Sequence, residues 1–245
     1  MSKIEMINLE KKDAKIEVDI WSDIVCPFCY IGKRNFENAL KEKGLEGKVN
    51  VHWRSFELAP DAVTKPDGDV YKDLAARKGW SIENTKQMHK QVTQRAAEAG
   101  LTYDFDIAVP ANSRNAHRLL HLAAKHNVQN EVKESLFKAY FTEGKNIDDE
   151  QVLTAIGREA GLAEADIKET LHKQLFESEI DADIREASGI GVQGVPFFVF
   201  NRKYGVSGAQ PVQAFAEAVE KVADEMGITA DQADSAFCST DGECS

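Results

Sequence analysis

The sequence has few cysteines, no long apolar run and no excess of positive charge. Four cysteines among 245 residues are too few for a secreted scaffold held together by disulfides. The first residues alternate charged and apolar side chains, whereas a signal peptide needs about 7–15 apolar residues in a row and a membrane helix about 20. A net charge of −11 without a basic cluster excludes a nucleic-acid surface. We therefore expect a cytoplasmic protein without a membrane or nucleic-acid partner.

The cysteines that are present form two pairs, and the first pair lies between a predicted strand and a predicted helix. Residues 15–21 alternate as in a strand, and Pro27 fits the first turn of a helix that continues to about residue 43. The partial positive charge at a helix N-terminus favours a thiolate at Cys26. Cys29 lies one turn further on, within reach of the first sulfur. The spacing predicts that Cys26 attacks a disulfide and that Cys29 resolves the mixed disulfide.

A Cys-x-x-Cys spacing also occurs in zinc sites and among inert thiols of a protein core. The strand-to-helix context favours the redox interpretation. Val195 and Pro196 precede a further predicted strand, at the place where thioredoxin-like folds have a cis-proline beside the dithiol. The alternative for Pro196 is an ordinary proline at the start of a strand. In the redox interpretation, the backbone of Val195 faces a bound substrate chain.

The order of predicted elements indicates an α/β protein. The chain opens as strand, helix and strand, and it closes with a hairpin at residues 197–207 and a helix at 210–225. Between these parts the pattern is helical, with expected helices at 69–78, 82–99, 113–126, 129–142, 149–159, 164–174 and 178–188. Asp148 with Gln151 resembles a capping box for one of these helices. This predicts a thioredoxin-like fold, with a central mixed sheet and a large all-helical insertion. The expected domains are 14–62 with 189–226, the insertion 63–188, and a tail 227–245 that contains two cysteines.

Most of the chain closely resembles the DsbA-like family, in particular its FrnE-like branch. The resemblance lies in residues 21–32, 53–58, 116–123, 139–144, 194–200 and 206–211. It implies a thioredoxin fold with a helical insertion, Cys26 as nucleophile, Cys29 as resolving thiol and Pro196 as cis-proline. It also implies no cofactor beyond the redox-active disulfide.

Two related groups of enzymes differ from this chain within the dithiol motif. The 2-hydroxychromene-2-carboxylate isomerases and kappa-class glutathione transferases typically have serine where this chain has Cys26. Secreted DsbA-type oxidases usually have histidine where this chain has Phe28. Because phenylalanine cannot donate a hydrogen bond to a thiolate, we expect a milder, isomerase-like or reductase-like potential.

Residues around the dithiol are the expected substrate contacts. They are Val195, Pro27, Phe28, Asn112, Gly208 and Gln210. Asn112 either contacts substrate or caps the next helix. The turn at Gly208 and Gln210 either binds a carboxylate of a peptide or of glutathione at a helix N-terminus, or is only a tight turn. Glutathione or another small thiol is therefore an expected co-substrate.

Charged residues near the motif have a functional and a structural interpretation. Asp19 or Asp23 could pass a proton to Cys29, although Asp19 is expected to cap or to face solvent. Lys33, together with Arg34, is expected on a solvated helix face. His117 and His121 are one turn apart, but without a third ligand packing is favoured, so no metal site is predicted.

The second cysteine pair, Cys238 and Cys244, allows three interpretations. It could exchange electrons with Cys26 and Cys29, form a structural or inert pair, or bind zinc. The sequence does not decide between them.

The preferred function is a thiol–disulfide oxidoreductase or isomerase that acts on protein or small-molecule disulfides, with an unknown thiol as electron donor. One alternative is a glutathione-dependent transferase or isomerase. The other is a non-enzymatic thioredoxin-like module that binds a partner or holds zinc. The inserted helices offer enough surface for a homodimer.

Overall fold

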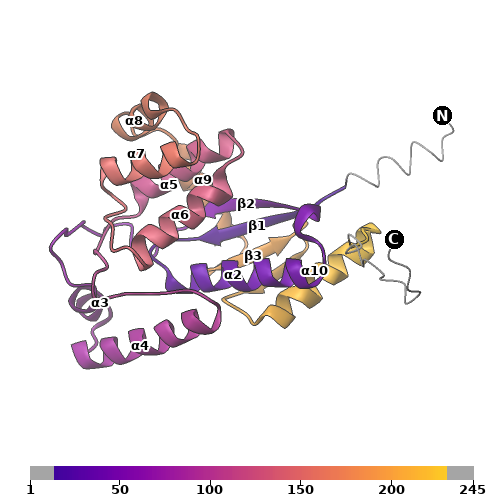
Figure 1. Cartoon of the computed structure of the whole chain (residues 1–245), viewed down its shortest axis with the longest axis horizontal. Helices are drawn as coiled ribbons and strands as arrows, with labels where there is room; N and C mark the ends of the chain where they lie inside the picture. The colour runs from indigo at the N-terminus through magenta and orange to yellow at the C-terminus, as the bar shows by residue number, and fades with distance from the viewer. Residues whose placement is uncertain (1–13, 231–245) are drawn as a thin grey trace, which may run out of the picture.

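The computed structural model describes residues 14–230 and contains one mixed four-stranded sheet within them. The strand order is β2 (Val49–Ser55), β1 (Ile16–Ser22), β3 (Phe197–Phe200) and β4 (Tyr204–Ser207). β1 is parallel to β2, whereas the pairs β1–β3 and β3–β4 are antiparallel. Strands from the two ends of the chain therefore meet in one sheet (Figure 1). This confirms the predicted α/β, thioredoxin-like fold class.

Two long helices pack together against the sheet: α2 (Pro27–Glu42) and α10 (Val212–Met226). Phe36 of α2 and Phe215 of α10 meet Phe198 and Phe200 of β3, with ring centroids 4.6–5.9 Å apart. These rings are fully buried or nearly so. Because each ring removes a large apolar area from water, the aromatic cluster fixes α2, and with it the dithiol, on the sheet.

The chain between β2 and β3 is helical, as predicted. Its helices are α3 (Val70–Lys78), α4 (Ile82–Glu98), α5 (Arg114–Lys125), α6 (Gln129–Phe141), α7 (Glu150–Glu159), α8 (Glu164–His172) and α9 (Glu177–Gly189), and a short 3₁₀ turn, η1 (Glu46–Lys48), precedes β2. α5, α6 and α9 contact the edge strand β2, and α4 contacts α2 (Figure 1). Observed and predicted helix ends differ by at most two residues. The predicted division into domains stays a prediction.

The edge strand β2 is closed in part by a side chain of α6. The Gln129 side-chain amide accepts a hydrogen bond from Trp53 N–H at 3.0 Å and donates one to Trp53 C=O at 3.0 Å. It thereby takes the place of a neighbouring strand at that position. The Trp53 indole also donates to Asn130. These contacts join the helical segment to the sheet.

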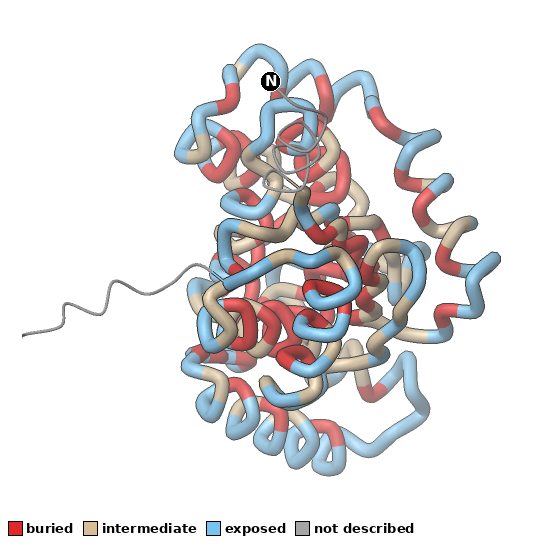
Figure 2. Tube along the Cα trace, turned by 90° about the vertical axis from the view of Figure 1, so that its right-hand side faces the viewer, coloured by how far each residue is buried: buried red, intermediate tan, exposed pale blue. Residues whose placement is uncertain are grey.

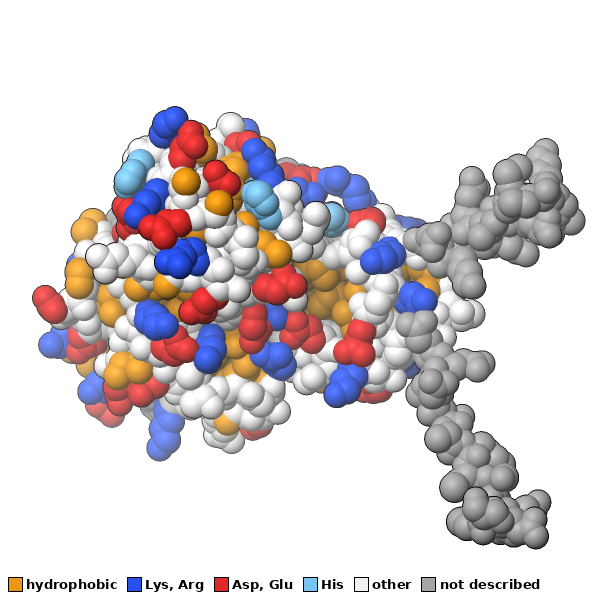
Figure 3. Space-filling view, turned by 45° about the horizontal axis from the view of Figure 1, so that its top comes forward, with side chains coloured by type: hydrophobic (Ala, Val, Ile, Leu, Met, Phe, Trp, Pro, Cys, Tyr) orange, Lys and Arg blue, Asp and Glu red, His pale blue; other side chains and the backbone are white. Residues whose placement is uncertain are grey.

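Buried residues lie in the interior of the trace and exposed ones on the outer turns of the helices (Figure 2). The largest buried apolar cluster includes Cys26 and Cys29 together with Leu119 of α5 and Phe137 of α6. The dithiol therefore lies where the helical segment packs on the start of α2. On the surface in Figure 3, acidic and basic side chains are interspersed. Among the described residues, no helix is long and apolar enough to cross a membrane.

One local prediction from the sequence needs correction. Asp148 with Gln151 resembles a capping box, but Asp149 caps α7 and accepts hydrogen bonds from Gln151 N–H and Val152 N–H. Asp148 instead accepts from Thr64 Oγ1 and Asn115 Nδ2. Adjacent aspartates offer the same capping group, so the sequence could not separate them.

Candidate active site

The two cysteines lie at the start of α2, directly after the loop that follows β1. Cys26 is the N-cap residue with extended backbone angles, and Pro27 occupies the first turn. The Cys29 N–H donates to the Cys26 C=O at 3.0 Å, which closes this turn. Both thiols are free, and both residues are buried. The arrangement places the second sulfur one helical turn behind the first.

The loop before β3 lies against Cys26. The Val195–Pro196 peptide bond is cis, and the Cys26 thiol donates to the Val195 carbonyl oxygen at 3.4 Å. The Pro196 carbonyl accepts from Gly208 N–H at 2.8 Å. The loop also lies close to α2, because a Cβ added at Gly32 would be 2.9 Å from Pro196 Cγ. The structure thus brings Val195 and Pro196 together with Cys26.

The pKa of Cys26 lies well above its ordinary value. The hydrogen bond with the Cys29 thiol is the largest cause, followed by burial, and the Cys29 N–H acts in the opposite direction. The Val195 carbonyl can only accept a hydrogen bond, so it too favours a thiol over a thiolate. The helix N-terminus favours the thiolate through the Cys29 N–H, as expected from the sequence, but the Cys29 thiol and burial outweigh it.

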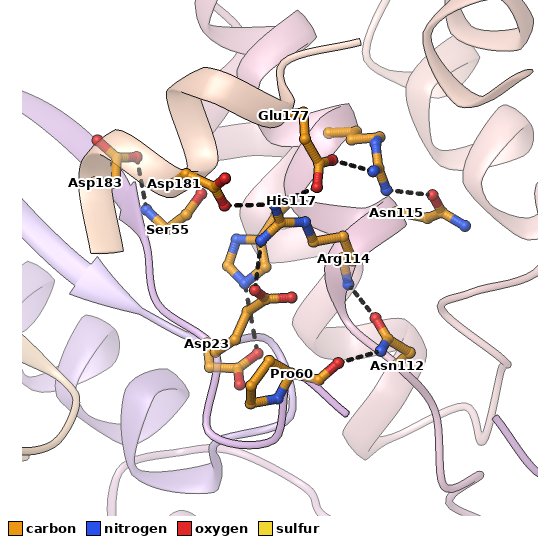
Figure 4. Close-up of polar contacts among 12 residues, drawn as sticks. Asp23, Ser55, Pro60, Asn112, Arg114, Asn115, His117, Glu177, Asp181 and Asp183 are labelled. Atoms are coloured by element: carbon orange, nitrogen blue, oxygen red, sulfur yellow. Dashed lines mark hydrogen bonds and ion pairs between the residues drawn. The ribbon is translucent and has the colours of Figure 1, made fainter. Parts of the chain in front are cut away.

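Asp23 is a buried carboxylate three residues before Cys26. It accepts hydrogen bonds from Leu58 N–H at 2.8 Å and from Val25 N–H, and His117 Nε2 lies 3.6 Å from it (Figure 4). Burial raises the pKa of Asp23, but the contacts with His117, Leu58 N–H and Ser113 outweigh it and hold the pKa below its ordinary value. The carboxylate is therefore a fixed negative charge near the dithiol.

A charged network holds α5, which supplies His117, against its surroundings. Arg114 binds Glu57, Glu177 and Asp181 at 2.5–2.6 Å (Figure 4). Glu57 follows β2, whereas the other two carboxylates belong to α9. Arg114 therefore links α5, the segment after β2, and α9.

His117 and His121 have different neighbours, although they lie one turn apart on α5. His121 Nε2 is 3.0 Å from Ser55 Oγ and 3.4 Å from Asp183, and its ring stacks on Phe176. Within residues 14–230 no group of three or more histidines, cysteines or acidic residues is arranged for a metal ion. Both histidines are packed into the protein.

Two expectations for charged residues are wrong. Asp19 does not face solvent, since β1 is a central strand, and its carboxylate binds Arg54 of β2 at 2.6–2.7 Å. Lys33 is buried rather than solvated, and its ammonium binds Glu37 at 2.6 Å and Glu134 at 2.5 Å. Helix α6 covers this part of α2, which the periodicity of α2 alone does not reveal.

The expected substrate contacts outside the dithiol have internal roles. Asn112 donates to the Pro60 and Ala62 carbonyls and accepts from Arg114 N–H, so it closes the turn directly before α5, whose N-cap residue is Ser113 (Figure 4). Gln210 precedes the N-cap Pro211 of α10, and its N–H donates to Gly208 C=O. These bonds agree with a turn at both places. A substrate contact at either place stays a prediction.

Contacts around the first turn of α2 complete the site. Arg95 of α4 lies over the Phe28 ring, 5.2 Å from its centroid. The Tyr103 hydroxyl donates to Pro27 C=O at 2.7 Å, and Glu134 of α6 binds Tyr30 at 2.6 Å. Sequence reasoning missed Tyr103 and Glu134. Cys238 and Cys244 lie outside the described residues.

The fold and the site agree with a match to a known family. Residues 17–220 match the model of the DSBA-like thioredoxin domain. The chain belongs to this family. The DSBA-like chain is 35% identical to a probable DsbA oxidoreductase from Streptomyces coelicolor, whose structure matches with a TM-score of 0.79 over 86% of this chain and 91% of that one.

Two further relatives are more distant. An uncharacterised protein of Bacillus subtilis, YwbO, is 28% identical over 206 residues, which are 83% of this chain and 96% of that protein. The cytosolic disulfide reductase DsbM from Pseudomonas aeruginosa, in a structure with glutathione, is 16% identical, with a TM-score of 0.60 over 84% of this chain and 98% of that one. This last likeness concerns the fold. Family membership and the oxidoreductase relative support an oxidoreductase or isomerase activity for this DSBA-like protein.

Proposed function

We propose that this DSBA-like protein is a thiol–disulfide oxidoreductase in which Cys26 attacks a disulfide and Cys29 resolves the product. The proposal rests on one observation: two free thiols, one turn apart, lie at the start of a helix beside the Val195 carbonyl. A substrate chain that runs along this loop brings its disulfide to Cys26. The substrates are protein or small-molecule disulfides.

Disulfide exchange at Cys26 and Cys29 proceeds in two steps. The Cys26 thiolate forms a bond to one substrate sulfur, and the other sulfur leaves with the electron pair of the broken substrate disulfide and takes up a proton. Cys29 then loses its proton and bonds to Cys26, which releases the first substrate sulfur. Substrate gains two electrons, and the Cys26–Cys29 disulfide forms. A small thiol then reduces the enzyme disulfide, and glutathione is the candidate in view of the DsbM relative.

The direction that we propose is reduction or isomerisation. A strong oxidant needs a reduced form that is stabilised as a thiolate. Here burial and the neighbouring thiol raise the pKa of Cys26, and Phe28 supplies no hydrogen-bond donor. A reductase role also suits a cytoplasmic thiol pool, the compartment that the DsbM name states for that protein.

Insulin-disulfide reduction with glutathione as donor tests the proposal. Cys26→Ser should abolish turnover, and Cys29→Ser should accumulate a mixed disulfide that mass spectrometry detects. The variant Cys238→Ser with Cys244→Ser shows whether the tail pair takes part. Retained turnover in Cys26→Ser would sink the proposal. Glutathione conjugation that survives Cys29→Ser would support the transferase alternative, and stoichiometric zinc in the purified protein would support the zinc-holding one.

A further inference from the structure

Lys133 is a buried charged residue that the fold does not explain. It lies on α6, and its relative exposure is 0%. Within the described part of the chain, its ammonium nitrogen has no hydrogen-bond partner. Its Nζ lies over the rings of Trp53 and Phe137, 5.2 and 4.7 Å from their centroids. An ammonium that is buried without a partner destabilises a folded protein, so its presence calls for a functional reason.

The surroundings of Lys133 connect it to the dithiol. The Phe137 ring stacks on the Tyr30 ring with centroids 4.8 Å apart, and Tyr30 directly follows Cys29. Phe137, Tyr30 and both cysteines belong to one buried cluster. In a buried cluster of this kind the dielectric is low, which strengthens the interaction between charges.

The charged and titratable groups that act on Lys133 come from three places. The pKa of Lys133 is lowered to about 8, because burial outweighs the opposing effects of Asp23 and of negative charge that forms at Cys29 and Cys26, and Lys33 lowers it further. Cys26, Cys29 and Lys33 are at or on α2, and Asp23 is in the loop before it. From α5, His117 contacts Asp23. Among the negative groups, the two sulfurs change charge during disulfide exchange, and Asp23 does not.

We propose that Lys133 is a positioning residue for the resolving step: its ammonium stabilises the Cys29 thiolate that forms in the mixed disulfide. This rests on the proposed function. In that state Cys26 is bound to the substrate sulfur. Cys29 loses its proton to water, and the new negative charge faces the ammonium of Lys133. Cys29 then bonds to Cys26, and the substrate sulfur leaves with the electron pair and takes up a proton from water.

The same charge favours the reduced enzyme over the disulfide, because only the reduced enzyme can hold a thiolate. After oxidation, Asp23 is the negative group that remains near Lys133, and the ammonium gives up its proton more easily. Lys133 thus adjusts the redox equilibrium without touching the substrate.

The experiment compares Lys133→Met with Lys138→Met in a full-length chain that also has Cys238→Ser and Cys244→Ser. Lys138 is on the same helix but is exposed and binds Glu143. In each variant, the glutathione adduct of Cys26 is formed and the release of glutathione by Cys29 is followed at pH 7. Lys133→Met should slow release by about tenfold or more, and Lys138→Met should leave it unchanged. The equilibrium with glutathione should shift toward the disulfide by about tenfold, which corresponds to about 30 mV.

A second readout separates this role from a structural one. Methionine fills a similar volume without a charge, so Lys133→Met should be at least as stable as the wild type in urea unfolding. In a Cys26→Ser background, the Cys29 thiolate is followed by its absorbance at 240 nm as the pH is raised. The midpoint of this titration should shift to higher pH when Lys133 is replaced. A folded Lys133→Met that releases glutathione at the wild-type rate would overturn the inference, as would a variant that fails to fold. If the wild type itself does not release glutathione, the result refutes the proposed function rather than the role of Lys133 alone.

Discussion

Gly32 offers a test of the contact between α2 and the loop at Pro196. It lies inside α2, six residues after Cys26, and its missing side chain leaves room for the proline ring. A Cβ at this position would be 2.9 Å from Pro196 Cγ and 3.4 Å from the Phe198 ring. Carbon atoms in good contact are about 3.5–4.0 Å apart, so Gly32→Ala must displace the loop or the helix by about 0.6–1.1 Å.

The magnitude follows from two opposing terms. Alanine is better than glycine in a helix interior by about 1 kcal/mol, whereas overpacking of a tight contact costs about 1–3 kcal/mol. We expect a net loss of about 1 kcal/mol in the free energy of unfolding, which lowers Tm by about 2–4 °C in a chain of this size. Since the displaced loop presents the Val195 carbonyl to Cys26, turnover should fall roughly 10–100-fold.

The assay measures urea unfolding and insulin reduction on the same preparations. Gly189→Ala is the matched control, because it also lies in a helix and a Cβ there meets nothing within 4 Å. That variant should be as active as the wild type and at least as stable. Wild-type turnover in Gly32→Ala would refute the reasoning, because it would mean that the loop moves away without consequence for Cys26.

Two carboxylates give further predictions. Glu134→Gln should lower the free energy of unfolding by about 1–2 kcal/mol at pH 7, since the partly exposed carboxylate binds Lys33 and Arg34. Burial raises the pKa of Glu134, but Lys33 and Arg34 outweigh it and hold the pKa below 4.5. Because the folded protein lowers this pKa, the carboxylate stabilises it above pH 4.5 and loses that effect in acid. Urea unfolding curves of variant and wild type should therefore converge below pH 4.5. A difference in the free energy of unfolding that stays constant with pH would contradict this. Asp23→Asn should lower stability by about 3 kcal/mol and also lower the pKa of Cys26, because a negative charge is removed. Faster iodoacetamide labelling of Cys26 at pH 7, followed by mass spectrometry, checks the second effect, and slower labelling would disprove it.

The fold could be predicted largely because its signals are local. Alternation in β1, a proline after Cys26 and apolar stripes between Gly and Ser breaks are visible within single segments. Asn201 and Arg202 both have positive φ in the hairpin turn, a conformation that asparagine favours and arginine does not. The wrong details, such as Asp148 as a cap, concern choices between neighbours with the same chemistry.

The electrostatics of the site could not be predicted, because its charges come from distant segments. Lys33 looks like an exposed residue on α2 until Glu134 of α6 covers it. Asp19 meets Arg54 only after β1 and β2 pair. One signal was available: Lys133 shares the stripe of Leu136 and Phe137 on α6, and a lysine within an apolar stripe marks a buried charge.

The helical segment does more than cover the dithiol. The two sulfurs and the Val195 carbonyl belong to the thioredoxin-like part of the chain, but His117, Lys133 and Glu134 belong to α5 and α6. Of these residues, Lys133 interacts with charge at Cys29 and Cys26, and both helices are held near the site by packing on β2 rather than by the motif itself. Substitutions in α5 and α6 can therefore change the redox equilibrium while Cys-Pro-Phe-Cys stays the same. The motif predicts the chemistry, and we expect the inserted helices to adjust the charge on its two sulfurs.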